Sequence, residues 1–410
     1  MERISYNNLA DLLGVSRATL KSWETKGVCV PECDADGRKF YFVNKLDLPE
    51  VKQMLMSTWN EEKECLPHRP FTSIELFAGA GGLALGMAQS GFNHLLLNEW
   101  DSDACATLRL NRPDWNVVQE DVHNVDFTEY KGKVDLLTGG FPCQAFSYAG
   151  KQGGFNDTRG TLFFELARAV KEVQPAVFVA ENVKGLLNHD SGKTFNTICN
   201  AIKELGYTLL AYKVMRAIMY AVPQKRERLI LVAVRNDIAP YAEFIWPSPY
   251  YRVLTLRDAF CKGVLYNEDV PYSAGQQYPE KKRKVMDLVP MGGDWRDLPV
   301  DIQKEYMGGS FYLGGGRTGM ARRLSLDEPS LTLTCAPAQK QTERCHPIET
   351  RPLSIREYAR IQTFPDEWKF SGNLSSQYKQ IGNAVPVNLA AAVGRSIIRM
   401  LNGLVAKGKL

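Results

Sequence analysis

The sequence predicts an α/β protein built on a doubly wound sheet, with two smaller parts attached to it. Short apolar runs alternate with helical patterns in residues 71–249. Residues 250–345 are rich in Tyr, Gly and Pro and show no long periodicity, and helical periodicity returns in 354–364 and 387–401. Alternating strands and helices are typical of a largely parallel sheet. We therefore expect a main domain formed by 71–249 and 346–410, interrupted by an irregular lobe of residues 250–345.

The predicted strands are short runs rich in Val, Leu, Ile and Phe, each bounded by turn residues or by a helical pattern. In an open α/β sheet, ligands bind beyond the carboxyl ends of the strands, so residues that follow these runs are the first candidates for a site. The runs are 73–77, 94–98, 117–119, 134–137, 177–180, 208–213 and 229–234.

The N-terminal residues predict a helix-turn-helix. The stretch from Leu9 to Glu24 has a helical pattern, a tight turn at Gly14 and a second helix that begins after a Ser16 cap. A second helix in this arrangement presents its outer face to a DNA groove. The outward residues that we expect to contact DNA are Arg17, Thr19 and Lys21.

The next segment completes this predicted domain. Residues 37–43 predict a wing strand and 44–56 a closing helix, so residues 1–56 resemble the winged helix-turn-helix heads of MerR-type regulators. Residues 57–70 are polar and contain two prolines, which indicates a linker.

Composition excludes several classes of protein. Hydrophobic residues make up 44% of the 410 residues, enough for a large core, and no apolar run approaches the ~20 residues of a membrane helix. Nine cysteines at irregular spacing do not resemble a secreted disulfide framework, so we expect a cytoplasmic protein with no membrane partner. We predict no metal site. The net charge of +4 permits a nucleic-acid partner without requiring one.

Residues 74–87 predict a strand, a glycine turn and the start of a helix. Gly79, Gly81 and Ala84 fit the G-x-G-x-x-A fingerprint of dinucleotide sites, and Glu99 follows about 20 residues later, where a carboxylate can hold ribose hydroxyls. An NAD enzyme and an S-adenosylmethionine enzyme both need these features. Asp121, after the third strand, adds a second carboxylate suited to an adenine amino group.

One cysteine stands where a nucleophile is expected. Cys143 lies in the stretch from Thr138 to Ser147, behind a proline and directly after the apolar run 134–137. Free cysteines are more often small buried hydrophobes. A position beyond a strand end, in a cleft, favours the alternative that its thiolate reacts.

Seven short motifs in one order are the most specific signal in the chain. They are FAGAGG, NEWD, EDV, GGFPCQAFS, ENV at 181–183, QKRER at 224–228 and GNAVP at 382–386. This set resembles the cytosine-5 DNA methyltransferase family of bacterial and phage type. The resemblance covers about 71–234 and 351–401, and it leaves 250–345 where the family has its target-recognition domain.

The resemblance implies a Rossmann-like S-adenosylmethionine methyltransferase sheet and a role for each motif. Cys143 adds to carbon 6 of a flipped cytosine, Glu181 provides the proton or hydrogen bond at ring nitrogen 3, and Arg226 and Arg228 hold the base, the glutamate and a phosphate. It also implies that S-adenosylmethionine lies against Phe77, Gly79, Gly81, Gly82, Glu99, Trp100, Asp121, Val122, Pro142, Leu162, Asn383 and Ala384, and that Ser147 and Arg159 contact DNA.

The expected partner is double-stranded DNA, bound by a monomer, with a cognate restriction endonuclease as a functional and not a physical partner. The predicted head adds a promoter operator as a second DNA ligand, bound separately from catalysis. Two alternatives remain open at this point: an RNA cytosine-5 methyltransferase with the same motifs, and a DNA-binding regulator that carries a methyltransferase body.

Overall fold

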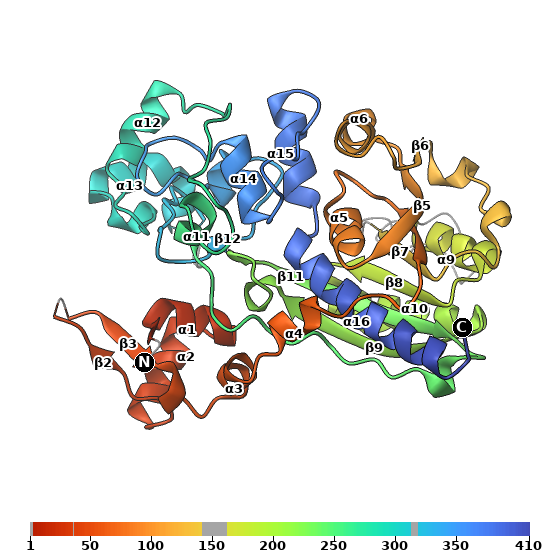
Figure 1. The fold of residues 1–410 in the computed structure, drawn as a ribbon. Helices are drawn as coiled ribbons and strands as arrows, with labels where there is room; N and C mark the ends of the chain where they lie inside the picture. The colour runs from red at the N-terminus through yellow and green to blue at the C-terminus, as the bar shows by residue number, and fades with distance from the viewer. Residues whose placement is uncertain (1–2, 36, 142–161, 313–318) are drawn as a thin grey trace.

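The computed structural model describes residues 3–35, 37–141, 162–312 and 319–410 (Figure 1). Its centre is a seven-stranded sheet whose strands coincide with the seven predicted runs. Across the sheet the order is β6 (Val117–Gln119), β5 (Phe92–Glu99), β4 (Phe71–Leu76), β7 (Leu136–Gly140), β8 (Val177–Asn182), β11 (Glu227–Arg235) and β9 (Tyr207–Arg216).

The sheet is mixed, which refines the predicted doubly wound architecture. Neighbours from β6 to β8 pair in parallel, whereas β11 is antiparallel to both β8 and β9. The connection from β9 to β11 is short, and consecutive strands joined without a crossover helix pair antiparallel. The carboxyl ends of β4, β5, β7 and β8 therefore share an edge with the amino end of β11.

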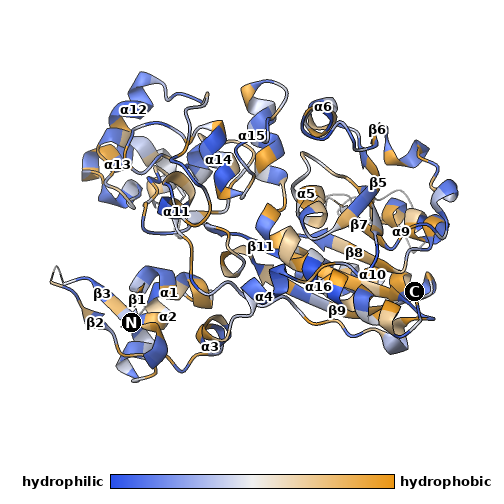
Figure 2. Cartoon of the chain, viewed as in Figure 1, coloured by the Kyte–Doolittle hydropathy of each residue, from blue (hydrophilic) through white to orange (hydrophobic). Residues whose placement is uncertain are grey.

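Helices cover both faces of the sheet. On one face α5 (Gly82–Gln89) and α16 (Val387–Ala406) share a hydrophobic cluster with residues of β4, β7 and β8. On the other face α9 (Leu162–Val173) and α10 (Lys193–Glu204) pack on alternate residues of the same strands. Figure 2 shows the apolar colouring concentrated in the strands and in α16.

Helix α16 belongs to the returning C-terminal part of the main domain, and it contains the helical periodicity predicted for 387–401. Among the described residues, the helical stretch Leu374–Ala406 is the one long and apolar enough to cross a membrane by length and composition, but 78% of its apolar window is buried inside the protein. Its apolar face is already covered by α5 and the sheet, as expected of a core helix.

The N-terminal head, defined here as residues 3–56, contains three α-helices and a small sheet. Helix α1 (Tyr6–Leu13) ends at Gly14, which has a left-handed φ of 66°, and α2 (Arg17–Thr25) begins at Ser16, whose hydroxyl accepts from the Thr19 amide. A three-stranded sheet has the order β1 (Arg3–Ser5), β3 (Lys39–Phe42), β2 (Glu32–Cys33), and α3 (Pro49–Leu55) closes the head.

The segment 57–70 differs from the predicted linker. It contains helix α4 (Trp59–Lys63), and Trp59 is buried against Tyr220 and Tyr250, with the Arg395 guanidinium 4.6 Å from its ring centroid. The Ser57 hydroxyl also donates to the carbonyl of Pro249. The head is thus attached by a packed helix, because the aromatic side chain of Trp59 contacts residues that are distant in sequence.

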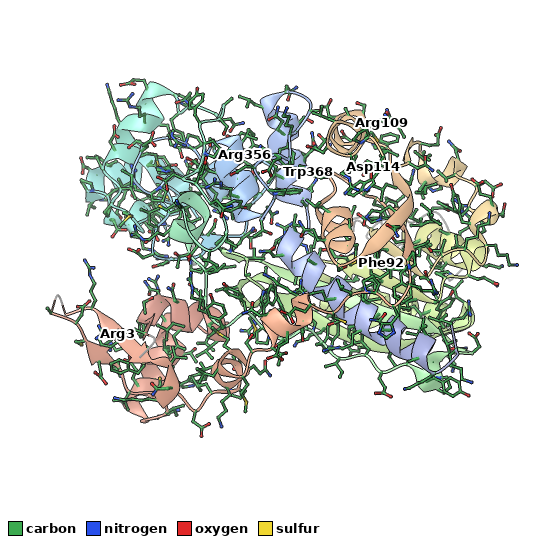
Figure 3. The ribbon with its side chains drawn as sticks, viewed as in Figure 1. Arg3, Phe92, Arg109, Asp114, Arg356 and Trp368 are labelled. Atoms are coloured by element: carbon green, nitrogen blue, oxygen red, sulfur yellow. The ribbon has the colours of Figure 1, made fainter. Side chains whose placement is uncertain are left out.

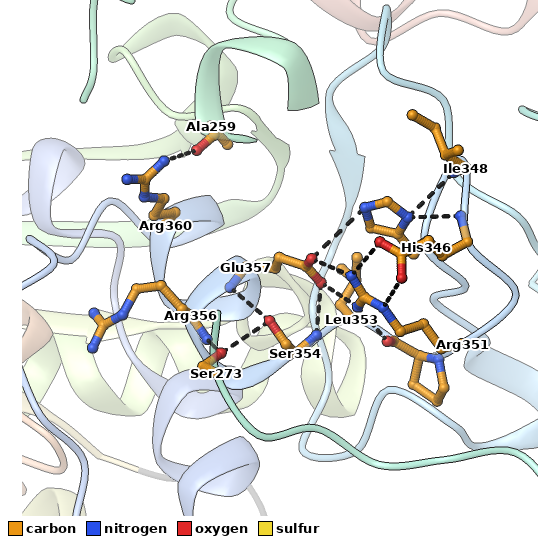
Figure 4. A network of polar contacts seen from close by, with 12 residues as sticks. Ala259, Ser273, His346, Ile348, Arg351, Leu353, Ser354, Arg356, Glu357 and Arg360 are labelled. Carbon is orange, nitrogen blue, oxygen red and sulfur yellow. Dashed lines mark hydrogen bonds and ion pairs between the residues drawn. The ribbon is translucent and has the colours of Figure 1, made fainter. Parts of the chain in front are cut away.

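The lobe of residues 250–345 carries α11 (Leu256–Phe260), α12 (Glu280–Asp287), α13 (Val300–Met307) and the two-residue strand β12 (Ser330–Leu331), which pairs with β10 (Gln224–Lys225). A polar network joins this lobe to α14 (Ile355–Ile361) (Figure 4). Arg360 donates to the Ala259 carbonyl. The backbone amide of Arg356 donates to the Ser273 hydroxyl, which in turn donates to the Ser354 hydroxyl.

The predicted domain boundary at residue 346 therefore does not separate two units, because residues on both sides of it pack together. Arg351 makes a two-armed ion pair with Glu357, at 2.7 and 2.8 Å, and Glu357 completes a capping box with Ser354. Arg356 donates to the carbonyls of Pro365 and Trp368, and Figure 3 labels Arg356 and Trp368. These contacts hold the loop before α15 (Leu374–Asn383).

Candidate active site

A cavity of about 780 Å³ lies at the shared strand edge. It gathers most of the predicted motif residues from both parts of the main domain, which are far apart in sequence. From the predicted set, its lining includes Phe77, Gly79, Gly82, Glu99, Trp100, Glu181, Arg226, Arg228, Asn383 and Ala384.

The glycine turn between β4 and α5 forms one wall. Phe77 and Gly79 both have left-handed φ angles, 58° and 54°, and a Cβ built on Gly79 would meet no atom within 4 Å. The turn thus leaves open space in front of its backbone, where a ligand can approach closely. Strain in a residue other than glycine, as at Phe77, is typical of functional sites.

The next two glycines, Gly81 and Gly82, have closer neighbours than Gly79, although Gly82 also lines the cavity. A Cβ on Gly81 would lie 2.7 Å from Leu108 and 3.0 Å from Trp368, and one on Gly82 would lie 2.3 Å from the Val385 carbonyl oxygen. Gly81 lines neither this cavity nor the adjoining one. Both glycines therefore permit close packing beneath the turn.

Glu99 lies at the end of β5, and its carboxylate accepts three backbone N–H groups. They come from Gly79 at 2.8 Å, Trp100 at 2.9 Å and Asp101 at 2.8 Å. These bonds fix the carboxylate beside the turn. Oε1 accepts two of them and Oε2 accepts one, so Oε2 retains a lone pair for a further donor.

A second pocket of about 390 Å³ adjoins the first through Phe77, Glu99 and Trp100. It contains the other predicted cofactor residues that the structure describes, Asp121, Val122 and Leu162. Hydrogen bonds from the His123 ring and amide lower the pKa of Asp121, so this carboxylate is an anion at neutral pH. Trp100 is 72% exposed, which leaves its ring free to cover a ligand.

Glu181 ends β8 on the opposite wall. It is buried, and its carboxylate lies 2.7 Å from the Nε of Arg228. Burial raises the pKa of Glu181 even against the two nearby arginines, because desolvation disfavours the charged carboxylate. Its neighbour Asn182 donates to the Phe141 carbonyl at 2.7 Å and so fixes the last described residue before Pro142 and Cys143.

Arg226 does not pair with Glu181 directly. Its guanidinium donates to the carbonyls of Leu333, Gly382 and Asn383, so it joins three separate segments of the chain. Burial lowers the pKa of Arg226 to about 9, which leaves it a cation at neutral pH. No described atom accepts from its buried Nε.

Several predicted residues lie elsewhere. Pro142, Cys143, Ser147 and Arg159 lie outside the described residues. Arg17, Thr19 and Lys21 are on α2 of the head and line neither cavity. Within the part of the chain that the structure describes, no three His, Cys, Asp or Glu side chains are grouped closely enough to hold a metal ion.

Sequence reasoning missed Glu75, which lies inside β4 and lines the cavity. Its side chain is 1% exposed and accepts from the Thr138 hydroxyl at 3.2 Å. Burial raises the pKa of Glu75 to about 8, so it carries a proton at neutral pH. The one signal available was an acidic residue inside an otherwise apolar run.

Comparison with known proteins agrees with this site. Residues 71–399 match the model of the C-5 cytosine-specific DNA methylase family. Type II methyltransferase M.Eco47II from Escherichia coli is 62% identical over 403 residues, covering 98% of this chain and 96% of its own. Type II methyltransferase M.PspPI from Psychrobacter sp. (strain TA137) is 60% identical, covering 96% and 95%.

Solved structures show the same fold. A crystal structure of a putative DNA modification methyltransferase encoded within an E. coli prophage matches with a TM-score of 0.58 and 25% identity, covering 81% of this chain and 99% of that one. The glycine turn with open space before it, the fixed Glu99 and the adjoining Asp121 fit S-adenosylmethionine, the methyl donor of this enzyme class. The chain belongs to the C-5 cytosine-specific DNA methylase family and is an S-adenosylmethionine-dependent DNA cytosine-5 methyltransferase.

Proposed function

We propose that methylation proceeds through Cys143, Glu181, Arg226 and Arg228. The observation that supports this proposal is the placement of Glu181. A buried carboxyl with a raised pKa lies at the strand edge, in the same cavity as the cofactor turn. A carboxyl whose proton is held more tightly than in water is better suited to general acid use.

Each residue has a defined task in this proposal. The Cys143 thiolate forms a bond to carbon 6 of the cytosine while Glu181 supplies a proton or strong hydrogen bond at nitrogen 3, which makes carbon 5 nucleophilic. S-adenosylmethionine, when bound, supplies an electrophilic methyl group. Loss of the carbon 5 proton then allows the sulfur–carbon bond to break, and the thiolate returns.

The arginines would position these groups. Arg228 is already paired with Glu181 and keeps it oriented, and the unpartnered Nε of Arg226 offers a donor to the base or to a phosphate. Phe77, Gly79, Glu99, Trp100, Asp121, Val122, Leu162, Asn383 and Ala384 would hold the cofactor. Pro142 belongs to the same proposal by its motif, as do Ser147 and Arg159 for DNA contact.

The test is the change Cys143→Ala. It should leave S-adenosylmethionine binding, measured by calorimetry, nearly unchanged while methyl transfer and covalent trapping on DNA containing 5-fluorocytosine both disappear. A Cys335→Ala variant is the matched control, because Cys335 is the exposed thiol that lines the same cavity. An adduct formed by Cys143→Ala would assign the chemistry to another thiol.

The relatives are named Type II methyltransferases, and we propose that this chain likewise protects host DNA in the cytoplasm against a cognate endonuclease. We expect it to act as a monomer on its target. Bisulfite sequencing of DNA from a host that expresses the chain would give the recognition sequence and the methylated cytosine.

A second candidate function is operator binding by the head, which we propose to be a winged helix-turn-helix. Arg17 and Lys21 on α2 are exposed, and the turn and cap have the expected geometry. The full chain should then retard DNA from upstream of its own gene, and Arg17→Ala with Lys21→Ala should remove that retardation. Unchanged retardation of the DNA by the double variant would exclude α2 as the helix that contacts the operator.

A further inference from the structure

Two strands of only two residues each, β10 and β12, lie beside the N-terminal head. Lys225 ends β10, and its Nζ lies 2.5 Å from the carboxylate of Asp11 on α1 of the head. Glu328, just before β12, accepts a hydrogen bond from Asn7 at 2.6 Å and lies 3.8 Å from Arg17. The head therefore contacts the catalytic domain at β10 and the lobe at the start of β12.

Asp11 and Lys225 form an ion pair that is mostly removed from water. Their side chains are 19% and 23% exposed, and Glu328 is a more distant partner of Lys225 at 3.8 Å. Burial raises the pKa of Asp11 and Lys225 opposes that rise, so each charge stabilises the other. Removing one member of such a pair costs more than at the surface, because the other is left uncompensated. Loss of the Asp11 charge should therefore let Lys225 move toward Glu328.

The position of β10 depends on side chains, because a ladder of two residues supplies few backbone hydrogen bonds. Successive side chains of a strand point to opposite sides. On one side, Gln224 donates to the Gln362 side chain and accepts from the Leu333 amide. On the other side, Asp11 is the nearest partner of Lys225. The head thus provides one of the two side-chain attachments of this strand.

Arg226 follows Lys225 directly and lines the catalytic cavity. Its side chain is 2% exposed, and its backbone amide donates to the Gln224 carbonyl at 3.0 Å. A shift of Lys225 is passed to Arg226 through the backbone that they share. Small shifts matter here, since a misplacement of about 1 Å in an active site can lower the rate roughly 100-fold.

We propose that Asp11 is a positioning residue for methylation, because its pairing with Lys225 holds the adjoining Arg226 in place. This role for Asp11 rests on the proposed function of Arg226. Neither Asp11 nor Lys225 lines the catalytic cavity, so the effect passes through β10. The head then contributes to the reaction without any contact between Asp11 and the DNA.

Asp11→Asn in the full chain tests this role, because it keeps the shape of the side chain and removes its charge. The single-turnover rate of methylation should fall about tenfold, as for a displacement of a fraction of an ångström. The rate is expressed per S-adenosylmethionine site counted by calorimetry, which leaves unfolded chains out. The dissociation constant for S-adenosylmethionine should stay within about twofold, because Arg226 is not among the proposed cofactor residues. Asp11→Glu restores the carboxylate and should recover most of the rate.

Glu50→Gln is the matched control. It removes another head carboxylate, which lies 3.3 Å from Arg216 of β9 and so attaches the head without holding β10. Its rate should stay within about twofold of the wild-type rate. An equal loss in Glu50→Gln and Asp11→Asn would overturn the proposal, because attachment of the head in general would then explain both. An unchanged rate in Asp11→Asn would also overturn it.

Arg226→Lys separates this inference from the proposed function of Arg226. The variant should lower the rate, and adding Asp11→Asn to it should cause little further loss, because both changes act on the same group. A further tenfold loss in the double variant would refute the positioning role alone. An unchanged rate in Arg226→Lys would refute the proposed function of Arg226 and the positioning role with it.

Discussion

Glu75 makes a sharp prediction about stability and pH. Its carboxyl is buried in β4 and its pKa is raised from 4.5 to about 8. The folded protein therefore keeps a proton that the unfolded chain releases above pH 4.5. The stabilising effect of this proton is complete below pH 4.5 and is lost as the pH rises toward 8.

The size of the effect follows from the two pKa values. Each pH unit between them lowers the free energy of unfolding by about 1.4 kcal/mol, so the loss between pH 5 and pH 7.5 is roughly 3 kcal/mol. Glu75→Gln keeps the shape of the side chain and its acceptor for Thr138 but cannot ionise. This variant should lack that loss.

Urea unfolding of both proteins at pH 5 and pH 7.5 measures the difference. The free energy of unfolding of the wild type, relative to Glu75→Gln, should fall by roughly 3 kcal/mol over this interval. Glu61→Gln, at an exposed position, is the control and should follow the wild type. If Glu75→Gln shows the same pH dependence as the wild type, the carboxyl is not held neutral and the reasoning is wrong.

Further changes test the site. Gly82→Ala should lower the free energy of unfolding by about 1–3 kcal/mol in thermal melts, since its Cβ would lie 2.3 Å from a carbonyl oxygen, whereas Gly403→Ala, whose Cβ would meet no atom within 4 Å, should not lower it; equal melts would contradict this. Gly79→Ala should weaken S-adenosylmethionine binding and, because Gly79 has a φ of 54°, should also lower stability. Glu99→Ala should weaken that binding by about 1–3 kcal/mol in calorimetry, and tight NAD binding instead would refute the cofactor. Burial lowers the pKa of His94 from 6.5 to about 4, so in urea unfolding the free energy of unfolding of the wild type, relative to that of His94→Gln, should fall as the pH drops through this range.

The sheet was predictable from local sequence. Each of the seven strands is an apolar run with its own turn signals, and this pattern does not depend on distant partners. The turn at Gly14 and the Ser16 cap were equally local. In contrast, strand β1 has only three residues and is formed by its pairing with β3. A run this short shows no hydrophobic periodicity, so the sequence did not predict this strand.

Features that depend on distant contacts were not predictable. Helix α4 is short, and only its packing against Tyr250 and Arg395 shows why Trp59 is buried. The reversed direction of β11 follows from its short connection to β9 and is not encoded in the composition of the strand itself. Among the site residues, the motif identified Arg226 but not the backbone carbonyls to which it donates, because backbone acceptors leave no trace in a sequence.

The packing of residues 382–387 against the glycine turn has a consequence for how the enzyme is made. Gly82, near the start of the catalytic domain, touches the Val385 carbonyl region, and Asn383 and Ala384 complete the cavity wall. A nascent chain on the ribosome lacks this wall until residues 382–387 have been synthesised. Chains that stop before these residues therefore cannot assemble the complete cofactor cavity.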